Sequence, residues 1–115
     1  LEKYPAEINE FHVAPQVSPE KGPPFHEWFI EFKKEPKNLD DFMFFLDKKM
    51  QSQNTYYKDL IGGKVLRPLV VSKIKKGGFI QYMKSVGKLG GQNKVPRLAN
   101  NRDIADKLRG FLDGK

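Results

Sequence analysis

The chain has 115 residues, 38% of them hydrophobic and 12% aromatic, which fits one folded domain and argues against disorder. Cysteine is absent, which excludes disulfides and thiol nucleophiles, fits a reducing compartment and leads us to expect a cytoplasmic location. The net charge of +7 is uneven, since residues 1–57 carry a net −3 and residues 58–115 a net +10. A basic half favours nucleic acid, a nucleotide or an acidic partner. No apolar run approaches the roughly 18 residues of a membrane-spanning helix, so we expect no membrane contact.

Two strands are predicted near the start of the chain, at residues 7–13 and 25–33, separated by a proline-rich loop. The second strand alternates, and its apolar face holds Trp28, Ile30 and Phe32. We expect Glu27 and Glu31 on the opposite face to be solvated. Phe29 breaks that polar face and indicates that something partly covers it.

A helix is predicted after Asn38, which is a good N-cap. Its apolar stripe includes Met43 and Met50 as core residues, and we expect Lys48 and Lys49 to lie in its last turn. A second helical piece is predicted over residues 54–61, ended by a glycine pair.

The second half predicts a strand over residues 66–74, in which Pro68 implies an edge position or a late start of pairing. A helix follows Gly77-Gly78 and ends at Gly87, and Asn100 or Asn101 caps a last helix. The stripe of that last helix comprises Ile104, Leu108, Phe111 and Leu112. The element order predicts an α+β fold: a two-layer sandwich of a small mixed or antiparallel sheet of about three strands, the first two antiparallel, with three to four helices.

Several kinds of site are disfavoured. The histidines, His12 and His26, lie on different strands, and even if they face each other across the hairpin no carboxylate stands at a ligand spacing, so we expect no metal site. No nucleophile elbow or Walker-type phosphate loop is present. RNA binding is a rival, although the strand at 25–33 lacks an RNA-recognition signature and carries Glu27 and Glu31, which would repel phosphate.

The segment Lys88 to Arg97 is the strongest candidate for function, because it joins cations to backbone-shaping glycines and a proline. Lys94 and Arg97, three residues apart, suit phosphate or carboxylate oxygens. The candidate phosphate-binding residues are Lys88, Gly90, Gly91, Gln92 and Arg97. The chain offers no base to pair with them, so a catalytic role requires residues from a larger domain.

Residues 88–98 resemble the C-terminal end of the Gretchen Hagen 3 family, the auxin-responsive acyl-acid amido synthetases, and look closer to its bacterial branch. Three further segments agree in the expected order: residues 10–15, 26–32 and 54–60. The resemblance spans nearly the whole chain. It implies that residues 1–115 are one domain, the mobile C-terminal domain of a larger adenylate-forming ligase.

The resemblance also implies an activity. A large N-terminal domain of the same polypeptide would bind ATP, Mg²⁺ and a small carboxylic acid, and the acyl-adenylate would then react with an amino acid to form an amide. Lys94 looks like the lysine that contacts the carboxylate and phosphate during adenylation, although Asn93 stands where the broader motif has glycine. The isolated domain is expected to be inactive. The alternative is a stand-alone basic α+β module that binds RNA or an acidic protein partner.

Overall fold

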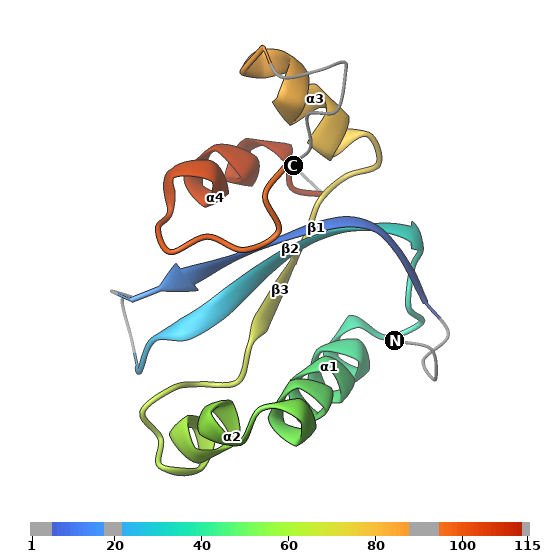
Figure 1. The fold of residues 1–115 in the computed structure, drawn as a ribbon. Helices are drawn as coiled ribbons and strands as arrows, with labels where there is room; N and C mark the ends of the chain where they lie inside the picture. Colours follow the sequence, from blue (N-terminus) through green and yellow to red (C-terminus); the bar gives the residue numbers. More distant parts are fainter. Residues whose placement is uncertain (1–5, 18–21, 88–94, 114–115) are drawn as a thin grey trace.

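The computed structural model describes residues 6–17, 22–87 and 95–113, which form three strands and four helices (Figure 1). The elements are β1 Glu7–Gln16, β2 Phe25–Lys34, α1 Leu39–Gln53, α2 Thr55–Gly62, β3 Val70–Lys73, α3 Gly78–Ser85 and α4 Asp103–Leu108, followed by a 3₁₀ turn at Arg109–Phe111. The predicted α+β class is confirmed. None of the helices in these ranges is long and apolar enough to cross a membrane.

The three strands form one mixed sheet in the order β1-β2-β3. β1 and β2 are antiparallel, as predicted, and β3 lies parallel to β2 with Phe29 opposite Ser72. Pairing in the third strand begins only at Val70, two residues after Pro68. The late start follows from proline, which has no N–H to donate to a ladder.

Helices cover both faces of the sheet, with α1 and α2 on one side and α3 and α4 on the other (Figure 1). The helices were expected in a single layer, but the central strand β2 buries a large apolar side chain on each of its faces: Phe29 and Ile30 are adjacent and both fully buried. Two hydrophobic cores result. The α1 core lies under β2 and contains Ile30, Phe32 and Phe42.

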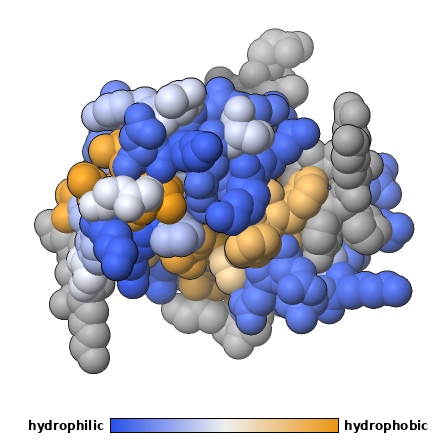
Figure 2. Space-filling view, turned by 90° about the horizontal axis from the view of Figure 1, so that it is seen from below, coloured by the Kyte–Doolittle hydropathy of each residue, from blue (hydrophilic) through white to orange (hydrophobic). Residues whose placement is uncertain are grey.

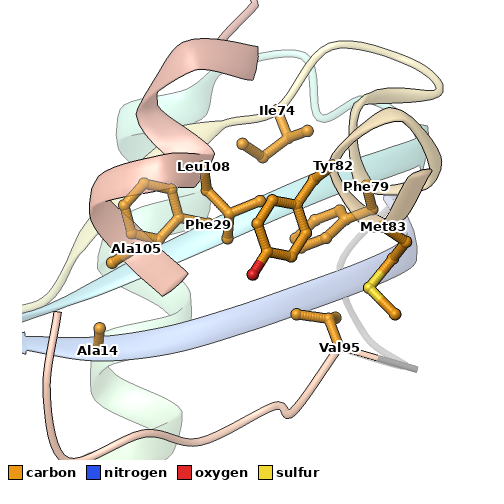
Figure 3. Packing of buried hydrophobic residues seen from close by; sticks show 9 residues of the cluster. All are labelled: Ala14, Phe29, Ile74, Phe79, Tyr82, Met83, Val95, Ala105 and Leu108. Carbon is orange, nitrogen blue, oxygen red and sulfur yellow. The ribbon is translucent and has the colours of Figure 1, made fainter. Parts of the chain in front are cut away.

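The second core, called the α3/α4 core here, lies on the other face of the sheet. It contains Phe29 of β2, Tyr82 and Met83 of α3 and Leu108 of α4 (Figure 3). The predicted stripe of the last helix is confirmed, because Ile104, Phe111 and Leu112 pack against this core. The expectation that something covers Phe29 is therefore confirmed.

Asparagine begins two of the helices. The Asn38 side-chain oxygen accepts a hydrogen bond from the Asp41 N–H at 3.1 Å, and Asn54 does the same for Tyr57. α1 runs on to Gln53, so the prediction that Lys48 and Lys49 lie in its last turn is wrong. α1 continues past them because the next residue that favours a helix boundary is Asn54, which ends α1 and caps the start of α2.

The other two helices end or begin near the predicted positions. Gly87 takes a left-handed φ of 72° directly after Val86, the residue that caps α3. α4 begins at Asp103 with Arg102 as its cap residue. Asn101 is one residue further upstream than a normal cap, but its side chain accepts a hydrogen bond from the Asp103 N–H at 3.0 Å.

Candidate functional site

The free edge of β1 holds Arg97, Leu98 and Ala99, which end and follow the basic segment Lys88 to Arg97. The Val13 N–H donates to the Arg97 carbonyl at 2.8 Å, and the Ala99 N–H donates to the Val13 carbonyl at 3.0 Å. These bonds form a short parallel bridge between Val13 and Leu98. An unpaired strand edge is thereby covered, and the C-terminal end of the basic segment, at Arg97, has a defined place on the sheet.

A buried histidine holds the same segment from inside the protein. His12 is 0% exposed, and its Nδ1 lies 2.5 Å from the Pro96 carbonyl oxygen, so Nδ1–H is the donor. Val95 enters the α3/α4 core beside Met83 (Figure 3). Burial is the main cause that lowers the pKa of His12; the bond to Pro96 opposes it, and the positive charge of Arg102 adds a smaller lowering. His12 is thus a neutral structural anchor at pH 7.

The two histidines do not face each other. His12 is paired with Phe29 in the β1–β2 register, and His26 is paired with Pro15. The His26 ring instead stacks on Tyr57 with the ring centroids 5.8 Å apart. Within the described ranges no group of three potential ligands is placed to hold a metal ion.

Arg97 is the one predicted site residue that the structure describes. Its Nε lies 3.1 Å from Oε1 of Glu10, and its guanidinium stacks over Phe11 at 5.0 Å from the ring centroid. The Arg97 side chain is nevertheless 60% exposed. Two contacts therefore orient the guanidinium while much of it stays accessible to an anion. The other candidates, Lys88, Gly90, Gly91, Gln92 and Lys94, lie outside the described residues.

Glu27 and Glu31 are buried, which corrects the expectation of a solvated face. Glu27 is 4% exposed and pairs with Arg102 and Arg109 of the C-terminal segment at 2.8 and 2.9 Å, and it also accepts a bond from Ser72. It therefore ties α4 and the following 3₁₀ turn to the sheet. Sequence reasoning placed these carboxylates in water because their partners lie 22 or more residues away along the chain.

Glu31 plays a corresponding part for α3. It is 5% exposed and accepts hydrogen bonds from the Gly77 and Phe79 N–H groups at 3.2 and 3.1 Å. Gly77 is the cap residue of α3 and has no side chain, so a carboxylate from β2 satisfies the first N–H groups of that helix. Neither glutamate is free to serve as a catalytic acid or base.

An apolar groove, which the sequence reasoning missed, opens beside the anchored segment. It has a volume of about 640 Å³, and the described residues that line it include no Lys, Arg, Asp or Glu. Strand, helix and loop residues contribute, among them Val17, Trp28, Tyr56, Tyr57, Leu66 and Leu98. Figure 2 views the molecule from the side of α1 and α2 and shows hydrophobic surface between hydrophilic patches. The only sequence signal for the groove is the tyrosine pair at the start of the second helix.

One wall of the groove is rigidly built. Asp47 of α1 is 4% exposed and accepts hydrogen bonds from the Tyr57 hydroxyl, the Leu69 N–H and the Gln51 side chain. This carboxylate thus joins α1, α2 and the approach to β3. Burial, and then the bond to Asp47, raise the pKa of Tyr57 well above its usual value. Burial also lowers the pKa of His26, which stacks on Tyr57.

Known proteins are similar to this chain in sequence pattern and in fold. The family pattern described as "GH3 family C-terminal domain" matches residues 1–103. A solved structure described as "GH3.15 acyl acid amido synthetase" superimposes with a TM-score of 0.72 at 19% identity, covering 96% of this chain and 21% of that one. A second, "AtGH3.15 acyl acid amido synthetase in complex with 2,4-DB", gives 0.70 at 21% identity, covering 96% and 22%.

At these identities the two solved structures show a shared fold, and this chain spans about a fifth of their length. None of the curated proteins matches the chain.

Proposed function

This chain belongs to the family of GH3 C-terminal domains, and from that premise we propose that it is the small domain of an ATP-dependent acyl-acid amido synthetase. The match over residues 1–103 carries the proposal. A large N-terminal domain of the same polypeptide would then bind ATP and the acyl acid. The four matching sequence segments favour an enzyme of the bacterial branch, and the cysteine-free composition favours a cytoplasmic location.

The proposed reaction has two steps. A carboxylate oxygen attacks the α-phosphorus of ATP and pyrophosphate leaves, which gives an acyl-adenylate. The amine of an amino acid then attacks the acyl carbon, AMP leaves with the bridging oxygen, and the amine gives up a proton. Mg²⁺ bound with ATP would neutralise phosphate charge. Because the described residues offer no metal-ligand cluster, we assign ATP and Mg²⁺ mainly to the large domain.

This chain would supply positive charge. Negative charge at the phosphorus and carboxylate oxygens is stabilised by a cation fixed nearby, and Lys94 is proposed for that role. The accessible guanidinium of Arg97 is proposed to contact phosphate, together with Lys88, Gly90, Gly91 and Gln92. Val13, through its backbone bonds to the segment after this loop, and His12, through Pro96, set where the loop returns to the sheet.

The test is pyrophosphate exchange by the full-length enzyme with a panel of carboxylic acids. Lys94→Ala should slow exchange at least about tenfold, a loss of about 1.4 kcal/mol in transition-state stabilisation. Lys84→Ala is the matched control, since Lys84 is an exposed lysine on α3, and it should leave exchange unchanged. Equal rates in the wild type and the Lys94 variant would remove this lysine from the mechanism.

The alternative, a stand-alone module that binds RNA or an acidic protein, rests on the basic second half of the chain. Glu27 and Glu31 do not repel phosphate at the surface, contrary to the prediction, because both are buried and bonded. However, helices cover both faces of the sheet (Figure 1), so β2 offers no open surface on which bases can stack. Tight binding to single-stranded RNA with a steep salt dependence would favour the module.

A further inference from the structure

The apolar groove concentrates the most exposed hydrophobic side chains that the structure describes. Leu98, Tyr56 and Val17 are 76%, 73% and 67% exposed, and all three line the groove. Charged residues make up 30% of the chain, yet none of those in the described ranges lines this surface. A contiguous apolar surface without charge is the usual mark of a surface that another group covers.

Hydrogen bonds inside the domain hold two parts of the groove in place. Its Tyr57 wall is fixed by Asp47, and its opposite side is fixed by the backbone bonds between Val13 and the segment at Arg97–Ala99. These restraints come from hydrogen bonds inside the domain. The surface is therefore preorganised, which lowers the entropic cost of docking.

We propose that this groove docks onto the large N-terminal part of the same polypeptide, on an apolar and uncharged surface of it. This inference rests on the proposed function and says which face of the domain meets that part. The matched amido synthetases extend far beyond the stretch that resembles this chain, which covers only 21% and 22% of them. A large covalently linked partner is thus the occupant that the comparisons favour.

The chain geometry limits how far the groove can lie from the chemistry. Leu98 follows Lys94 by four residues, and four residues span at most about 14 Å when fully extended. If Lys94 reaches a reacting phosphate in the large domain, Leu98 lies close to the surface of that domain. Val13 is bridged to Leu98, so Val13 and the rest of the groove then face the large domain as well.

The test is site-specific photo-cross-linking in the full-length protein. Tyr56→p-benzoylphenylalanine places a photoreactive ring in the groove, and Phe44→p-benzoylphenylalanine is the matched control, since Phe44 is 66% exposed on α1 and does not line the groove. We expect intramolecular cross-links from position 56 to peptides that precede this domain, at least about fivefold more than from position 44. Adding Leu98→Gln should reduce that yield.

Three outcomes would overturn the inference. Cross-links from position 56 that rise with protein concentration and join two copies would assign the groove to a homo-oligomer. Cross-links only to other proteins would assign it to a separate partner. Equal yields from positions 56 and 44, or none, would leave the groove exposed or filled by a small apolar molecule. The readout does not depend on activity, so it separates a failure of the groove assignment from a failure of Lys94 in pyrophosphate exchange.

Discussion

The two faces of the sheet are covered in different ways. On the α3/α4 side, the buried carboxylates of Glu27 and Glu31 are bonded to the helices that cover them, and the core around Phe29 is closed. On the α1/α2 side, the buried carboxylate of Asp47 also joins elements, but the core opens at the end of the sheet into a groove whose described lining residues include no charged side chain. The difference teaches that polar groups placed inside a fold fix its elements, whereas apolar groups left outside it leave a surface to be covered.

The largest effect is expected from the buried charge network. Glu27→Gln removes the charge that compensates Arg102, whose side chain is 18% exposed, and weakens the contact with Arg109. We expect a loss of about 3 kcal/mol in the free energy of unfolding, the low end for a broken buried pair because Arg109 is half exposed. Urea unfolding followed by circular dichroism measures it.

The control for that variant is Glu35→Gln. Glu35 pairs with Lys73 at 2.8 Å but is 48% exposed, so its loss should cost less than about 1 kcal/mol. Similar losses in the two variants would contradict the view that the α3/α4 side depends on buried charge.

A smaller effect on stability is expected from substitutions at two helical glycines, which compare the packing of α3 and α2. At Gly78, the first residue of α3, an added Cβ would lie 2.4 Å from Cγ2 of Ile74 and 3.3 Å from the Phe111 carbonyl oxygen. Gly78→Ala should therefore destabilise the protein by about 1–3 kcal/mol. At Gly62, at the end of α2, an added Cβ meets nothing within 4 Å.

Gly62→Ala should accordingly be neutral or raise stability by up to about 1 kcal/mol, because alanine reduces the entropy of the unfolded chain. Thermal unfolding of both variants is the measurement. A destabilised Gly62 variant, or a tolerated Gly78 variant, would show that the two sides do not differ in packing as described.

The smallest effect is expected from pH. Burial lowers the pKa of both His12 and His26 below the ordinary 6.5. Just below pH 6.5 the unfolded chain binds more protons than the folded protein, so stability is full above that pH and falls as the pH is lowered through the folded-state values. Urea unfolding at pH 7.5 and 5.5 should show the lower stability at pH 5.5.

The two histidines allow the same comparison of regions. His12→Gln should remove more of the pH dependence than His26→Gln, because His12 is fully buried against Pro96 and lies near Arg102, whereas His26 lines the groove. A pH dependence that neither substitution reduces would assign it to the carboxylates instead.

Local features of the fold followed from the sequence. Asn38 and Asn54 were predicted at helix starts, and the alternation at 25–33 predicted β2, because capping and periodicity depend on residues a few positions apart. Pro68 predicted an edge position or a late start of pairing, and β3 has both, since a missing N–H is a property of that residue alone. The basic segment Lys88 to Arg97 and its family resemblance could also be recognised from the sequence, because they too depend on residues a few positions apart.

Only the tertiary structure decided what covers each surface. The alternation of β2 predicted a solvated face at Glu27 and Glu31, whereas in the fold α3 and α4 cover both residues. The groove forms where β1, α2 and the segment at Leu98 meet. The anchoring of Pro96 by His12 joins residues 84 positions apart. Such pairings depend on how distant elements pack, which a local pattern of apolar and polar residues does not specify.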